Sequence, residues 1–130
     1  MRSTLVGALL LLTACAARKP ADSFIGEVPL QVTVRGSLYT GAATIARATG
    51  EQVNGTFTIA GPVEVKGTLS GRFGEKDVQL DFNYNIAANG CKGTMRLTGP
   101  TTTGATLVEG PAEAQDSCVG RMTGTFKLGR

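Results

Sequence analysis

The feature that most constrains the fold is a strict alternation of apolar and polar residues, clearest between Asp77 and Ile86. Successive side chains of a β-strand point to opposite faces, so this alternation places all the apolar residues on one face and all the polar residues on the other. The apolar positions are Val78, Leu80, Phe82, Tyr84 and Ile86. The pattern predicts an antiparallel strand with one buried and one solvated face.

The same pattern recurs in short runs from Glu27 onward, separated by glycines and prolines, and no run has a helical period of any length. Asn89-Gly90, a pair that adopts positive φ readily, would join two of these runs in a turn. The predicted strands lie near 28–35, 37–47, 52–60, 63–70, 77–86, 91–98, 104–109 and 117–128. We therefore expect an all-β fold, a single antiparallel up-and-down meander of about eight strands that forms a small barrel or a strongly curled sheet.

Glycines recur on the apolar face of these strands, in Gly-Thr-apolar units that begin at Gly55, Gly67, Gly93 and Gly124. A tightly coiled small sheet needs small residues on its inner side, so curvature explains them. The alternative is that they leave room for a ligand. The bulky residues expected inside are Val63, Val65, Leu69, Val78, Leu80, Phe82, Tyr84, Met95, Leu97, Met122 and Phe126. They are sufficient to fill a barrel of eight strands.

The N-terminus has the layout of a secretory signal peptide, with a basic start, an apolar run from Leu5 to Leu12 and small residues after it. The uncharged stretch 3–17 is shorter than the roughly 20 residues that a bilayer-spanning helix needs. We therefore expect no permanent transmembrane helix here. An ordinary signal peptide would be cut near Ala14, Ala16 or Ala17.

The sequence Leu12-Thr13-Ala14-Cys15 resembles the lipobox of bacterial lipoproteins. In that family the cysteine receives a thioether-linked diacylglyceryl group, signal peptidase II cuts just before it, and the new amino terminus is acylated, for example with palmitate. The resemblance implies lipidation of Cys15, and two or more acyl chains make membrane attachment stable. In the family, Asp after the cysteine favours the inner membrane. Ala16 therefore favours the outer membrane.

The chain thus divides into a signal peptide (1–14), a lipidated N-terminus and tether (15–26), and a β-barrel-like domain (27–130). The tether contains Lys19-Pro20 and small residues with little periodicity. Its length keeps the domain near the membrane surface. We expect a protein of the bacterial cell envelope that faces the periplasm and is anchored in the membrane by lipid.

Cys91 and Cys118 remain as an even pair in an oxidising compartment, which predicts a disulfide. The bridge would close a loop of about 28 residues and contribute about 3.5 kcal/mol in the chain-entropy model. If a full strand lay between the two cysteines, the strands on either side of it would be about 9.5 Å apart, whereas a disulfide tolerates Cα separations up to about 7 Å. We therefore expect the strand at 104–109 to be short, with Gly110–Asp116 looping away beyond it. Reactive or metal-binding thiols are the alternative.

The composition gives little support for catalysis or nucleic-acid binding. The chain has no histidine, which excludes Ser-His-Asp and Cys-His catalysis and most zinc sites. Asp77 and Asp81 share a face but lie about 13 Å apart, too far for a glycosidase pair. They would pair instead with Lys66, Lys92 or Arg96. Charges of both signs are scattered without a basic run. We expect no enzyme, no cofactor, no metal site and no nucleic-acid partner.

The meander, the glycine-containing units and the single disulfide resemble the calycin-type up-and-down barrels. They are also similar to small envelope lipoproteins that inhibit lysozyme, although no residue matches the inhibitory motif, so no functional residue is transferred. Two hypotheses follow. The first is a non-enzymatic protein-interaction, accessory or inhibitor module that works through loops or a sheet edge. The second is a carrier that binds a small apolar molecule or lipid in the barrel mouth. A filled interior favours the first, and glycines that face a void favour the second.

Overall fold

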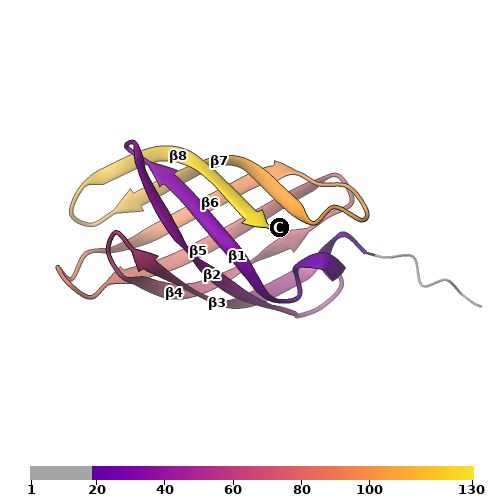
Figure 1. Cartoon of the computed structure of the whole chain (residues 1–130). Helices are drawn as coiled ribbons and strands as arrows, with labels where there is room; N and C mark the ends of the chain where they lie inside the picture. Colours follow the sequence, from indigo (N-terminus) through magenta and orange to yellow (C-terminus); the bar gives the residue numbers. More distant parts are fainter. Residues whose placement is uncertain (1–18) are drawn as a thin grey trace, which may run out of the picture.

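A computed structural model describes residues 19–130, and the predicted signal peptide and Cys15 lie outside this range. Eight antiparallel strands follow one another in chain order and close into a barrel (Figure 1). A short 3-10 helical turn, η1 (Pro20–Phe24), precedes them. The strands are β1 (Gly26–Val34), β2 (Ser37–Arg47), β3 (Gln52–Gly61), β4 (Val65–Phe73), β5 (Asp77–Ile86), β6 (Lys92–Pro100), β7 (Leu107–Asp116) and β8 (Gly120–Gly129). The expected all-β meander is confirmed.

The barrel closes because its first and last strands pair with each other. β1 and β8 are antiparallel neighbours from Leu30 opposite Leu128 to Val34 opposite Gly124. Closure leaves no free sheet edge, so every strand has a neighbour on both sides. Within residues 19–130, no helix is long and apolar enough to cross a membrane.

The predicted boundaries of three strands were wrong. The strand predicted at 117–128 begins only at Gly120. The segment Gly110–Asp116 does not loop away, because β7 continues through it as far as Asp116. Pro111 made this segment look like a loop, because proline has no N–H to donate to a neighbouring strand. It lies just past the end of the β6–β7 ladder, so its missing N–H costs no hydrogen bond to β6. Val63, predicted to be inward, precedes β4 and is exposed.

One end of the barrel is plugged by η1. Phe24 is fully buried and stacks on Phe73 at the end of β4, with ring centroids 4.9 Å apart. Pro20 is also buried, and Asp22 forms an ion pair with Arg47 at the end of β2. Residues 20–26 were predicted to be tether but belong to the folded barrel. The predicted tether is therefore reduced to the few residues between Cys15 and Lys19.

The inward-facing glycines allow close strand approach and do not face a void. A Cβ at Gly67 in β4 would collide with the carbonyl oxygen of Asn83 in β5 and lie 2.9 Å from the Phe57 ring. A Cβ at Gly93 in β6 would similarly collide with the Gln115 carbonyl oxygen. The Phe57 ring thus occupies the space beside Gly67, and the Tyr84 ring occupies the space beside Gly93. This supports the curvature explanation over room for a ligand.

We predict that Gly67→Ala lowers the free energy of unfolding by at least about 2 kcal/mol, because the added methyl group has no space against the backbone of β5. The matched control is Thr68→Ala, the next residue of the same strand, whose side chain faces solvent. It should cost less than about 1 kcal/mol. Urea unfolding of both variants measures the difference. Equal losses would show that the glycine is not required by close packing.

Candidate functional site

The end opposite η1 carries a small pocket, which we call the mouth pocket. It has a volume of about 90 Å³, and all eight strands contribute to its wall. The lining residues are Val32, Val34, Tyr39, Phe57, Ile59, Val65, Tyr84, Ile86, Met95, Ala114, Asp116 and Met122. The β1–β2, β3–β4, β5–β6 and β7–β8 turns surround this end, on the left in Figure 1. The mouth pocket is apolar except for two tyrosines and one carboxylate.

The size of the mouth pocket limits what can enter it. An apolar cavity of about 150 Å³ holds a benzene molecule, and sites for drug-sized ligands occupy roughly 300–1,000 Å³. The mouth pocket, at about 90 Å³, is smaller than either. Beneath it the barrel is filled, since Phe57 packs on Phe82 with ring centroids 4.8 Å apart. The mouth pocket therefore accepts a group about the size of one side chain.

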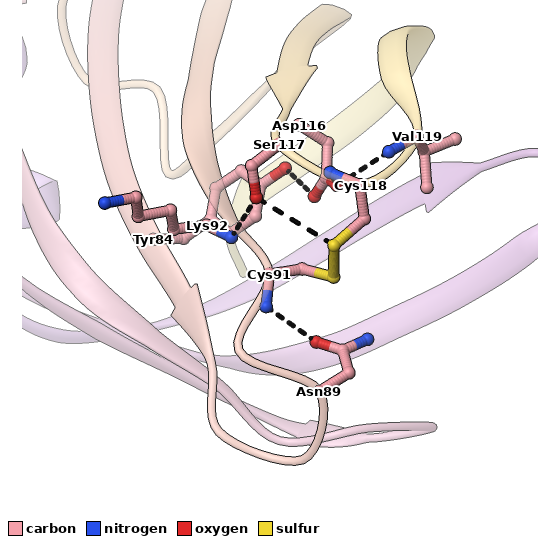
Figure 2. The surroundings of a disulfide bond; sticks show 8 residues. All are labelled: Tyr84, Asn89, Cys91, Lys92, Asp116, Ser117, Cys118 and Val119. Atoms are coloured by element: carbon pink, nitrogen blue, oxygen red, sulfur yellow. Dashed lines mark hydrogen bonds between the residues drawn. A yellow bond between two sulfur atoms is a disulfide. The ribbon is translucent and has the colours of Figure 1, made fainter.

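A hydrogen bond between two strands that are not neighbours organises the wall of the mouth pocket. The Tyr84 hydroxyl in β5 donates to Asp116 Oδ2 in β7 at 2.6 Å (Figure 2). Gly93 in β6 lies between them, opposite Tyr84 on one side and opposite Asp116 on the other. A side chain at Gly93 would occupy the place of the Tyr84 ring, since its Cβ would lie 2.7 Å from the hydroxyl oxygen. The glycine thus permits the contact between Tyr84 and Asp116.

Asp116 also holds the β7–β8 turn. Its Oδ1 accepts hydrogen bonds from the backbone N–H groups of Cys118, at 2.8 Å, and Val119, at 3.1 Å. Asp116 as a whole residue is only 8% exposed. One carboxylate therefore links the turn to the inner wall of the barrel.

The structure joins Cys91 and Cys118 in the predicted disulfide, but by a different geometry from the one expected. Cys91 directly precedes β6, whereas Cys118 lies in the β7–β8 turn and not in a strand. The β6–β7 ladder ends at Gly93 opposite Asp116, and its register continued by two residues reaches Cys91 and Cys118, whose Cα atoms are 5.7 Å apart. The bridge therefore joins the residue before β6 to the turn after β7, at the end where β6 and β7 are neighbours, so a full-length β7 presents no obstacle (Figure 2).

The Tyr84 phenol and the Asp116 carboxyl group shift each other's pKa. Burial, followed by the hydrogen bond to Asp116, raises the pKa of Tyr84. The hydrogen bond from Tyr84 lowers the pKa of Asp116, and the backbone N–H groups of Cys118 and Val119 lower it further, although burial opposes them. At neutral pH the wall of the mouth pocket therefore carries a neutral phenol and a negative charge.

Among residues 19–130, Cys91, Asp116 and Cys118 bring three potential metal-ligand atoms within 4.8 Å of one another. Metals bind the thiolate form of cysteine, and both sulfur atoms are held in the disulfide. The Asp116 carboxylate already accepts three hydrogen bonds. The cluster is thus a structural link between the turn and the barrel wall.

The carboxylates singled out in the sequence lie on the outer face of β5, away from the mouth pocket. Asp81 pairs with Arg96 at 2.9 Å, one of the expected partners. Asp77 pairs instead with Arg72 at 3.1 Å, across the β4–β5 turn. Asp116 was missed because its segment was predicted to be a loop. The alternation from Val108 to Asp116 was the signal that could have revealed it.

Comparisons with known proteins found no match to a family model, a curated protein or a solved structure.

We predict that Tyr84→Phe lowers the free energy of unfolding by about 2 kcal/mol at pH 7, the usual value of a hydrogen bond to a charged group. Because the folded-state pKa of Asp116 is lowered, its stabilisation is complete above the unfolded pKa of about 3.9 and is lost as the pH falls through the folded pKa. The deficit of the variant should therefore shrink in acid.

The control is Tyr39→Phe, which removes a hydroxyl from the same pocket without breaking the link to Asp116. Urea unfolding between pH 2.5 and 7 (about the range that brackets a carboxylate titration) measures both variants. A Tyr84→Phe deficit that is independent of pH would show that the hydroxyl does not stabilise the ionised carboxylate.

Proposed function

We propose that this protein is a lipid-anchored envelope lipoprotein, more specifically of the outer membrane, whose barrel is a non-enzymatic protein-interaction module of the accessory or inhibitor type. The observation that carries the proposal is the filled barrel, plugged at the end near the tether and open only as a small pocket at the other. A filled barrel can offer its outer surface to a protein partner but has little internal space for a bound ligand.

The short tether supports an orientation relative to the membrane. At about 3.5 Å per residue, Lys19 lies within about 14 Å of Cys15. Lys19 directly precedes η1 at the plugged end of the barrel. A lipid on Cys15 would therefore hold the plugged end at the membrane surface. The mouth would face away from the bilayer, where a soluble or periplasmic partner can reach it.

Exposed apolar side chains around the mouth support a protein partner. Leu38 is 52% exposed, Val63 38% and Val119 47%, and they come from three separate hairpins at this end. The disulfide and the Asp116 hydrogen bonds hold the β7–β8 turn that carries Val119. Rigid apolar groups around a pocket resemble the preorganised anchors of protein interfaces.

A backbone outlier lies at the same end. Arg35 has φ of 53° at the tip of the β1–β2 hairpin, a conformation that a two-residue turn requires but that Asn, Asp or Gly adopts more readily. The left-handed region costs a non-glycine residue roughly 1–2 kcal/mol. An arginine placed there despite this cost is consistent with a side chain that contacts a partner.

The alternative function, a carrier of a small apolar molecule or lipid, is supported by the apolar wall of the mouth pocket. Its volume of about 90 Å³ argues against this alternative, because an acyl chain or a cofactor would require the rings below to move. The lipid on Cys15 would be anchored at the opposite end of the barrel and could not fill the mouth pocket.

Mass spectrometry of the full chain, exported in a Gram-negative bacterium and extracted with detergent, tests both parts of the proposal. We expect the denatured mass to correspond to a chain starting at Cys15, with lipid attached and two hydrogens lost to the disulfide. Under native conditions we expect no additional mass. A small molecule that dissociates on denaturation would instead establish the carrier function.

The control is Cys15→Ser, which should remain unlipidated and leave the membrane fraction or keep its signal peptide. A wild-type chain cut near Ala16 or Ala17, without lipid, would refute the anchor.

A further inference from the structure

We propose that the mouth pocket binds the ammonium group of a lysine side chain from the protein partner, with Asp116 as its counterion. The partner in this inference rests on the proposed function. The preference of the mouth pocket for an ammonium group can be measured without any partner, so the two ideas can fail separately.

The first support is a buried charge that lacks a cation. Asp116 is 8% exposed, and none of the ion pairs formed within residues 19–130 includes it. A buried charge costs free energy unless an opposite charge compensates it. Hydrogen bonds from Tyr84 and the β7–β8 turn solvate the carboxylate but leave its charge in place. An incoming cation would neutralise it.

The remaining wall of the mouth pocket fits an alkylammonium group. Tyr39 and Tyr84 present aromatic rings, which attract a cation placed over their faces. Tyr39 also brings a hydroxyl group to the wall, whose oxygen can accept a hydrogen bond from an ammonium group. The apolar side chains match the hydrocarbon stem of lysine, which packs readily on apolar surface. The volume of about 90 Å³ suits one such side chain.

The hydrogen-bond pattern of Asp116 favours lysine over arginine. Oδ1 already accepts two backbone N–H groups, whereas Oδ2 accepts only the Tyr84 hydroxyl. One oxygen therefore has an open acceptor position. A guanidinium group binds best when two carboxylate oxygens accept its parallel N–H groups. An ammonium group is a compact point charge that needs only one.

At the same end of the barrel, Lys66 and Arg121 form ion pairs with Glu64 and Glu113. Arg35 at the β1–β2 turn and Lys92 at the start of β6 form none within residues 19–130. Both are exposed, so solvent and salt screen their repulsion of a ligand over about 8 Å at physiological ionic strength. The buried Asp116 is screened much less. The local field inside the mouth pocket therefore favours a cation.

The experiment uses the methionines as reporters. Apart from Met1, the chain contains only Met95 and Met122, and both line the mouth pocket. The full lipidated chain is labelled with ¹³C-methyl methionine in detergent micelles and titrated with butylammonium chloride. Parallel titrations use n-butanol and sodium butyrate, which have similar stems but neutral and negative heads. A second pair of ligands is a blocked Gly-Lys-Gly peptide and its Nε-acetylated form.

We expect saturable shifts of the Met95 and Met122 methyl signals with butylammonium and with the lysine peptide. Apparent affinities for butanol, butyrate and the acetylated peptide should be at least tenfold weaker. Equal affinities for butylammonium and butanol, or no saturable shift with butylammonium, would overturn the proposal. Binding of butylammonium without binding of the lysine peptide would overturn the lysine as the source and identify a free amine as the ligand.

Asp116→Asn keeps a side-chain oxygen for the β7–β8 turn but removes the charge. It should abolish the preference for butylammonium over butanol, and retention of the preference would exclude Asp116 as counterion. Tyr39→Phe is the second variant. It keeps the ring and should weaken butylammonium binding less than Asp116→Asn does. If Asp116→Asn fails to fold, the comparison of charged and neutral ligands on the wild-type chain decides the outcome.

Discussion

The hydrogen bond from Tyr84 to Asp116 is the interaction on which the mouth of the barrel depends. It crosses a whole strand, and it can do so only because Gly93 in that strand has no side chain. Asp116 in turn accepts from two N–H groups of the β7–β8 turn. The disulfide from that turn to the residue before β6 closes the same unit. Three strands and one turn are thus held around a single buried carboxylate.

The two ends of the barrel differ in how they are closed. At one end Phe24 of η1 stacks on Phe73, so η1 is part of the core and closes this end of the barrel. At the other end the core stops short of the rim, leaving a small apolar pocket that contains a carboxylate. In the proposed lipoprotein these ends correspond to the membrane side and the partner side.

Alternation of apolar and polar residues was enough to predict most of the fold. The bounds predicted for β2 and β5 agree with the structure, because each strand has one solvated face that keeps the period of two visible. The alternation did not reveal the full length of β7, because Gly110-Pro111 interrupts the pattern. Val108, Ala112 and Ala114 nevertheless continue it inside the barrel. The site was harder to predict, since Asp116 acquires its importance from the register of three strands and not from its neighbours in sequence. Lipidation at Cys15 and the partner remain predictions.

Site-specific photo-crosslinking in the anchored, full-length chain tests most directly whether the mouth is the working surface. A photoreactive amino acid replaces Val63 or Val119 at the mouth, and Leu107 serves as the control at the plugged end with a similar exposed fraction (41% against 38% for Val63). Irradiation of intact cells should give a discrete protein adduct, identical by mass spectrometry for Val63 and Val119, and no such adduct for Leu107. The same adduct from Leu107, or protein adducts from Leu107 alone, would contradict the assignment of the mouth as the interaction surface.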